Sequence, residues 1–234
     1  MPKEQHGSAV FGLWSKGCPP LRATFIGAYN LSCQLAGERT LDPSKSDGFI
    51  SFSGIDVGYA SLPRYFVDVN GDGAADYCRF VGTPTKPNLS CILSEPSSNK
   101  FSSNQFGYNS AIGIAVGYIQ FPRMMIDVDN DARADYCRIL GKPGDLFISC
   151  TLAGESHFKD QSQFVSDRNI DLGLDYLPRT FRDINNDKRA DFCRYAGTKP
   201  NIVLRCNYAT DTGFDDGTAG AQIGSPNQKA RYNQ

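Results

Sequence analysis

The chain has 234 residues, with 24 Lys and Arg against 25 Asp and Glu, which gives a formal net charge of −1. A chain of this length is able to bury a sizeable core as one all-β domain. The near-zero net charge gives no electrostatic basis for binding nucleic acid or an anionic membrane surface. No run approaches the roughly 18 apolar residues of a membrane span, and the first ten residues lack the pattern of a signal peptide. We therefore expect a soluble chain with no membrane span and no nucleic-acid partner.

The chain has eight cysteines, and none of them occurs in the C-x-x-C pair that is typical of zinc and redox sites. Disulfides are therefore expected. They imply a secreted or extracellular protein, whose native signal sequence has been removed or replaced by Met1. A cytosolic protein with reduced thiols is the alternative.

Three segments superimpose without a gap, starting at Leu62, Phe121 and Leu177. Each contains a Pro-Arg pair, an acidic loop, a D-Y/F-C-R sequence and a second cysteine, all at fixed spacing, and the loops recur after 59 and 56 residues. A degenerate first copy around Cys18 and Cys33 lacks the acidic loop. We expect one domain over 1–234, with a tail at 221–234 and repeats at approximately 1–47, 48–106, 107–164 and 165–220.

Runs of β-branched and aromatic residues that end at acidic turns predict strands and turns throughout. Cys137 and Cys150 lie symmetrically about Pro143-Gly144, the preferred central pair of a type II turn, so a strand, turn and strand would place them opposite each other. The same spacing predicts two further hairpin disulfides, and analogy predicts a fourth in the first copy. The four pairs are Cys78–Cys91, Cys137–Cys150, Cys193–Cys206 and Cys18–Cys33.

Each acidic loop has the pattern D-x-N/D-x-D-x-x-x-D, which supplies oxygen ligands at positions 1, 3, 5 and 9. Calcium takes six to eight oxygens, so the carbonyl at position 7 and water molecules would complete the shell, whereas magnesium accepts few all-protein cages. The alternative is a metal-free turn in which carboxylates cap backbone amides. We predict about three structural Ca²⁺ ions, held by Asp68, Asn70, Asp72, Ala74 and Asp76; by Asp127, Asp129, Asp131, Arg133 and Asp135; and by Asp183, Asn185, Asp187, Arg189 and Asp191.

The middle loop has four carboxylates where each of the others has three, so we expect it to bind calcium most tightly. Position 6 is glycine only at Gly73 and is Ala132 or Lys188 in the other loops. If position 6 requires a positive φ, the alanine opposes binding by roughly 0.5–1 kcal/mol. We expect the added carboxylate to outweigh that cost because it contacts the ion directly.

Over roughly residues 50–210, these loops between short strands resemble FG-GAP or VCBS repeats, the blades of integrin α-subunit propellers and of a fungal seven-bladed lectin family. The D-Y/F-C-R sequence with its second cysteine resembles a disulfide-bearing subtype found in secreted multidomain proteins. The resemblance implies a β-propeller. Four units would close as a four-bladed propeller in which the two terminal part-units share a blade. An arc from a larger propeller is the alternative.

An enzyme is not expected, because the only histidines are His6 and His157 and neither lies in a catalytic pattern. The lectin resemblance implies a glycan bound in clefts between blades, and the candidate ligand-binding residues are Tyr59, Arg64, Tyr118, Arg123 and Arg179. The alternative for the repeated arginines, which include Arg79, Arg138 and Arg194, is stacking and hydrogen bonding between blades.

The alternative function is protein–protein adhesion, assembly or an accessory role in a larger secreted protein, with an extracellular protein or a second copy of the chain as partner. Two N-x-S sequons, at Asn30 and Asn88, each lie three residues before a second cysteine of the repeat and are candidate glycosylation sites.

Overall fold

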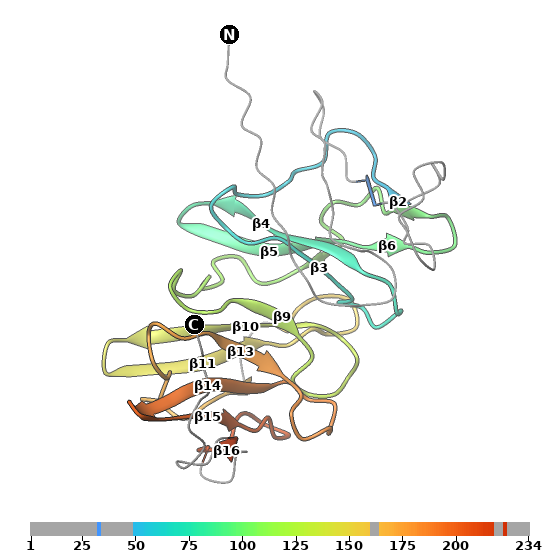
Figure 1. Cartoon of the computed structure of the whole chain (residues 1–234). Coiled ribbons are helices and arrows are strands. Elements are labelled where there is room, and N and C mark those ends of the chain that lie inside the picture. Colours follow the sequence, from blue (N-terminus) through green and yellow to red (C-terminus); the bar gives the residue numbers. More distant parts are fainter. Residues whose placement is uncertain (1–31, 34–48, 160–163, 218–221, 224–234) are drawn as a thin grey trace, which may run out of the picture. The chain divides into compact units, whose positions relative to one another are not determined.

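The computed structural model describes residues 32–33, 49–159, 164–217 and 222–223 (Figure 1). Sixteen strands and no helix occur in these ranges, so the predicted all-β class is confirmed for the described part of the chain. It follows that these ranges contain no helix that could cross a membrane. The strands form four four-stranded sheets. The chain divides into two compact units, Met1–Ile114 and Ala115–Gln234, which are described separately below.

The first unit contains two sheets. One has the order β3-β4-β5-β8 and is antiparallel throughout; its strands are β3 (Tyr65–Val67), β4 (Asp76–Thr83), β5 (Lys86–Ile92) and β8 (Tyr108–Asn109). The other has the order β1-β2-β7-β6; its strands are β1 (Ser32–Cys33), β2 (Phe49–Ile50), β6 (Ser94–Glu95) and β7 (Lys100–Phe101). In this second sheet β2 and β7 pair in parallel, with Ile50 opposite Lys100.

The second unit contains two antiparallel sheets of the same design. The first has the order β12-β11-β10-β9; its strands are β9 (Met124–Ile126), β10 (Asp135–Lys142), β11 (Asp145–Thr151) and β12 (Phe164–Val165). The second has the order β13-β14-β15-β16; its strands are β13 (Arg179–Arg182), β14 (Asp191–Thr198), β15 (Asn201–Asn207) and β16 (Gln222–Ile223). In each of these two sheets, as in β3-β4-β5-β8, the two central strands form a hairpin.

A disulfide joins the two strands of each central hairpin. The half-cystines lie directly opposite each other, as in the register Cys137↔Cys150, with Cα–Cα distances of 4.0, 4.0 and 4.1 Å. The three pairs are those that the repeat predicts: Cys78–Cys91, Cys137–Cys150 and Cys193–Cys206. Gly144 has φ +81°, the conformation that position i+2 of a type II turn requires. The predicted pair Cys18–Cys33 lies outside the residues whose side chains are described.

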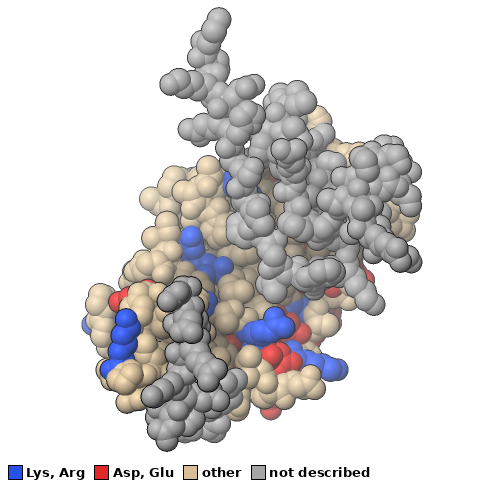
Figure 2. All heavy atoms as spheres, viewed as in Figure 1, with Lys and Arg blue, Asp and Glu red and all other residues tan. Residues whose placement is uncertain are grey.

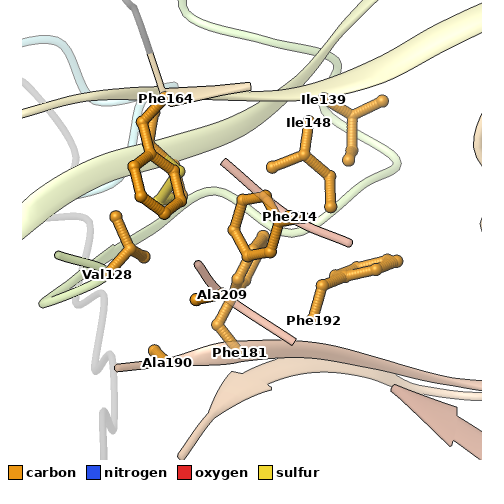
Figure 3. Close-up of a cluster of buried hydrophobic side chains, with 11 residues drawn as sticks. Val128, Ile139, Ile148, Phe164, Phe181, Ala190, Phe192, Ala209 and Phe214 are labelled. Carbon is orange, nitrogen blue, oxygen red and sulfur yellow. A yellow bond between two sulfur atoms is a disulfide. The ribbon is translucent and has the colours of Figure 1, made fainter. Parts of the chain in front are cut away.

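The first six residues of β4 are all buried, so this strand is covered on both faces rather than on one. In the second unit a buried cluster joins the two sheets. Its aromatic centre is formed by Phe164, Phe181 and Phe214, with ring centroids 5.2 Å apart for Phe164–Phe214 and 6.0 Å for Phe181–Phe214 (Figure 3). The Cys137–Cys150 disulfide is part of the same cluster. Each staple therefore lies in apolar surroundings, away from water.

A short hairpin follows the second cysteine of each repeat. It is β6–β7 in the first unit, and in the second unit it is reduced to the bridges Ala153↔Phe158 and Ala209↔Phe214. In each unit one such hairpin pairs in parallel with the segment at the start of the same predicted repeat, through Ile50↔Lys100 and Val165↔Gly213. We call this contact the parallel clasp. It joins the segment before the acidic loop to the hairpin after the second cysteine through main-chain hydrogen bonding.

Charged side chains of both signs lie beside one another on the face shown in Figure 2. The ion pairs of the described residues include Arg133–Asp131, at 2.6 Å, and Arg168–Asp145, at 2.9 Å. Local pairing of this kind agrees with the net charge near zero.

Candidate metal centre

The three acidic loops share one backbone conformation. Positions 4 and 6 are left-handed in every loop, with φ between +62° and +84°, whatever residue stands there. The residues are Gly71 and Gly73, Asn130 and Ala132, and Asn186 and Lys188. Position 6 therefore does require a positive φ, and Ala132 and Lys188 both bear the conformational cost that a glycine would avoid.

The aspartate at position 1 folds each loop around its own carboxylate. In the middle loop Asp127 accepts hydrogen bonds from the backbone amides of Asn130 at 2.7 Å and Ala132 at 2.9 Å. Asp68 and Asp183 accept the equivalent bonds from positions 4 and 6 of their loops. This geometry is the amide capping considered as the alternative to metal binding. It leaves the outer lone pairs of the carboxylate available for an ion.

The aspartate at position 9 is fully buried in each loop. Asp135 accepts hydrogen bonds from the amide of Val128, at 3.0 Å, and from the amide of Ala153, at 2.7 Å. Asp76 and Asp191 accept the same pair of bonds from their own repeats. Position 9 therefore ties the start of the loop to the strand that leaves the disulfide hairpin.

Burial raises the pKa of these carboxyl groups. The pKa of Asp76 rises to about 7, chiefly through desolvation, with smaller opposing contributions from its two backbone hydrogen bonds. The pKa of Asp135 lies well above its usual value, and that of Asp191 is also raised, in each case first through desolvation. A bound cation would favour the ionised form of each group.

The middle loop brings three carboxylates together. Oxygen atoms of Asp127, Asp129 and Asp135 lie within 4.8 Å of one another, as a shared hard cation requires. Asp129 Oδ1 is buried and has no hydrogen-bond partner among the described residues. Desolvation raises the pKa of Asp129, and the neighbouring Asp131 raises it further. The donors are all oxygens, so the residues fit a calcium ion.

The fourth carboxylate of the middle loop lies outside this cluster. Asp131 Oδ2 accepts a hydrogen bond from the Arg133 guanidinium at 2.6 Å, and Asp131 Oδ1 accepts one from the Arg133 amide at 2.9 Å. Lys159 Nζ lies 3.8 Å from Asp129 Oδ2. Two cationic side chains, Arg133 within the loop and Lys159 outside it, therefore offset part of the acidic charge of the loop.

The first and third loops have an asparagine at position 3. Asn70 donates from Nδ2 to Asp72 Oδ2 at 3.0 Å, and Asn185 donates to Asp187 Oδ2 at 3.1 Å. Arg189, at position 7 of the third loop, pairs with Asp211. The main chain of these loops matches that of the middle loop, but among the described residues only the middle loop forms a cluster of three acidic ligands.

The side chains predicted to bind a ligand are engaged with the main chain. The hydroxyls of Tyr59 and Tyr118 donate to the carbonyls of Gly82 and Gly141, both at 2.6 Å. Arg64 donates from Nε to the Val57 carbonyl at 2.7 Å, and Arg179 donates to the Leu172 carbonyl. Arg123 also has an interaction partner. These contacts favour the structural interpretation of the repeated residues.

The arginine of the D-Y/F-C-R sequence is buried in each sheet, as Arg79, Arg138 and Arg194. A glycine of the preceding link, Gly58, Gly117 or Gly173, lies against its stem: a Cβ on Gly58 would lie 2.6 Å from Arg79 Cγ. All three glycines have a positive φ. Sequence analysis missed this contact, although I-D-V-G, I-A-V-G and I-D-L-G recur before the loops.

Asn88 lies half-buried on β5, and the serine of its sequon, Ser90, is fully buried and hydrogen-bonded to Arg79. Asn30 lies outside the described residues. No family model, curated protein or solved structure matches the chain. The function is therefore argued from the site alone.

Proposed function

We propose that the chain is a calcium-stabilised, disulfide-stapled extracellular recognition module, lectin-like in function, with no enzymatic activity. The observation that carries the proposal is the oxygen cluster of Asp127, Asp129 and Asp135, on a loop whose backbone recurs twice more. Asp127 and Asp129 would hold the ion directly. Asp135 would hold it from the buried side while keeping its two backbone hydrogen bonds. Calcium would supply charge neutralisation and rigidity to the strand connection.

Secretion is supported by the three buried disulfides, which persist in oxidising compartments. The hairpin disulfides restrict the unfolded chain. Metal ions bound in the loops would stabilise the folded chain. Proteins commonly place binding residues on loops that a rigid framework holds in position. A binding module is therefore a better proposal than a conformational switch.

We further propose a propeller arrangement of the repeats, with closure into four blades. The support is the recurrence of the four-stranded sheet and of the parallel clasp, Ile50↔Lys100 and Val165↔Gly213, at the same place in two repeats. Blades in series are the arrangement in which each sheet meets its neighbours in sequence order. Small-angle X-ray scattering tests closure, because an open arc gives a larger radius of gyration than a closed ring of the same chain.

The function is tested with a glycan array probed in calcium and again after chelation with EGTA. Binding that is present in calcium and lost in EGTA supports the lectin-like module. Retention of binding after chelation would remove calcium from the mechanism. If no glycan binds while the chain forms a stable complex with itself or with an extracellular protein in calcium, the adhesion or assembly alternative takes its place.

A further inference from the structure

A polar cleft in the second unit lies beside β14 and β15. Its volume is about 480 Å³, within the range of about 300–1,000 Å³ that small-molecule sites usually have. Its walls come from the link at residues 167–171, from the central hairpin and from residues 215–217. Of the repeated arginines that the sequence offered as ligand contacts, Arg194 lines it, whereas the candidates Tyr59, Arg64, Tyr118, Arg123 and Arg179 do not.

Arg194 lines the cleft and is the buried arginine of its repeat, only 3% exposed. Its Nη1 donates to Asn207 Oδ1, and its Nη2 lies 3.7 Å from Asp171 Oδ2. Its Nε is buried and has no hydrogen-bond partner among the described residues. A buried charged donor without an acceptor is costly, and Nε is the donor of this cleft-lining side chain that lacks one among the described residues.

The same atom is satisfied in the other two repeats. Arg79 Nε donates to the Asp56 carbonyl at 2.8 Å, and Arg138 Nε donates to the Ala115 carbonyl at 3.1 Å. The equivalent residue for Arg194 is Asp171, and no such bond forms there. The unpaired Nε is therefore a departure of one repeat from a pattern that the other two keep.

A second departure lies directly across the hairpin. Arg79 and Arg138 face serines, Ser90 and Ser149, and Ser90 Oγ accepts a hydrogen bond from Arg79 at 3.1 Å. Arg194 instead faces Arg205, which is exposed. Like charges opposite each other in a sheet destabilise it. The serine hydroxyl of the other repeats is thus replaced by a second set of cationic donors at the cleft.

The cleft also carries acceptors. The Asp171 side chain is 51% exposed, and its Oδ1 accepts a hydrogen bond from the Gly173 amide at 2.8 Å. Asp167, Asp215 and Asp216 add further carboxylates. These would repel a simple anion, and the arginines would repel a simple cation. Neighbouring hydroxyls of a sugar suit such a surface, because each hydroxyl both donates and accepts.

We propose that the cleft at Arg194 binds one residue of a neutral saccharide. Arg194 Nε and the Arg205 guanidinium donate to hydroxyl oxygens, and the Asp171 carboxylate accepts from an adjacent hydroxyl. This inference rests on the lectin-like function proposed above and locates that function in one repeat. The middle-loop calcium site and the saccharide site are then separate places in the second unit.

The test uses the full chain in calcium, with ¹⁵N-labelled arginine, titrated with the methyl glycosides of glucose, galactose, mannose, N-acetylglucosamine and fucose and with any array-positive oligosaccharide. We expect the Arg194 Nε–H resonance to shift saturably with at least one probe. Asp171→Asn should weaken that probe by about tenfold, since a charge-assisted hydrogen bond is replaced by a weaker neutral one. Arg205→Ser, which introduces the serine found in the other repeats, should weaken it as well.

Asp56→Asn is the matched control. Asp56 occupies the equivalent position and accepts a hydrogen bond from the Gly58 amide at 2.8 Å, but the neighbouring Arg79 has its Nε paired and only its Nη2 without a partner among the described residues. We expect saccharide affinity to be unchanged in this variant. Calcium affinity should be unchanged in all three variants, and each should still unfold in one cooperative thermal transition, which separates lost binding from lost folding.

Three results would overturn the proposal in different ways. A probe that binds without moving the Arg194 resonance, and equally well to Asp171→Asn, would place the saccharide elsewhere and leave the lectin-like function standing. Failure of every saccharide, on the array and in the titration, would remove both the cleft and the function. Binding of a zwitterionic amino acid such as glycine in place of all saccharides would contradict the proposed ligand class.

Discussion

The loops at residues 68–76 and 127–135 have the same backbone but different ligand sets. Both are left-handed at positions 4 and 6, and both place a buried aspartate on two backbone amides. They differ at position 3, which is Asn70 in one and Asp129 in the other, and only the second loop gathers three carboxylate ligands. The comparison teaches that positions 1 and 9 fold the loop, whereas position 3 decides whether a third carboxylate joins the cluster.

The largest effect is expected at position 9. Asp76→Ala and Asp135→Ala should each lower the free energy of unfolding by about 2–5 kcal/mol, because two buried amides lose their acceptor in either loop. Urea unfolding in EGTA isolates this effect from metal binding. Asp131→Ala, which removes a partly exposed ion pair, is the control and should cost under about 1 kcal/mol. Clearly unequal losses for the two position-9 variants would break the claim that both loops fold alike.

Calcium removal comes next. A site held at a hundred times its dissociation constant adds about 2.7 kcal/mol of stability, so EGTA should lower the melting temperature, and excess calcium should restore it. Magnesium should restore it less well, because it accepts few all-protein cages. Differential scanning calorimetry provides the measurement. A melting temperature that is the same with and without EGTA would leave the loops as metal-free turns.

Exchanging position 3 between the loops sharpens the comparison. Asp129→Asn gives the middle loop the residue of the other two and should weaken its calcium affinity by about tenfold, or about 1.4 kcal/mol. Asn70→Asp should strengthen the first loop in return. Isothermal titration calorimetry measures both. Asp145→Asn, which breaks the ion pair with Arg168 outside the loops, is the control and should leave calcium affinity unchanged. An unchanged affinity in both exchange variants would contradict the role of position 3.

The smallest effect is expected at position 6. Ala132 has φ +64°, and a left-handed residue other than glycine costs roughly 1–2 kcal/mol, part of which glycine loses again through the entropy of the unfolded chain. Ala132→Gly should therefore stabilise the protein by about 0.5–1 kcal/mol. Gly73→Ala should destabilise it similarly, because a Cβ there meets no atom within 4 Å and only the backbone cost remains. If thermal melts show that Ala132→Gly destabilises the protein or that Gly73→Ala stabilises it, the left-handed conformation does not limit stability.

The sequence predicted what depends on short spacing. The hairpin cysteines are thirteen residues apart, and Cys137 and Cys150 flank a turn pair that places them in register. The acidic loops could likewise be recognised from the sequence, because their candidate ligands lie within nine residues. All-β structure followed from the same repeat. These features need no knowledge of which segments meet across the chain.

The remaining features depend on contacts between distant segments. Asp135 reaches Ala153, eighteen residues away, so its clamping role does not follow from the loop pattern. The pairing of Arg133 with Asp131 depends on a rotamer that spacing does not specify. The departure at Arg194 becomes visible only when the same atom is compared in three repeats. The glycines of the links could have been found from the sequence, because each ends a similar four-residue sequence ahead of its loop. These short sequences lay outside the segments that were aligned.

The parallel clasp tolerates change at some positions and excludes it at one. Ile50, Lys100 and Val165 have exposed side chains, and main-chain hydrogen bonds form irrespective of which residue supplies them. Gly213 differs, because a Cβ at this position would lie 2.2 Å from the carbonyl oxygen of Val165. Mutations can therefore accumulate at the three exposed positions but not at the glycine, while a repeat acquires a cleft such as that at Arg194. Gene duplication followed by unequal divergence would leave this record in the chain, with a uniform framework and one specialised copy.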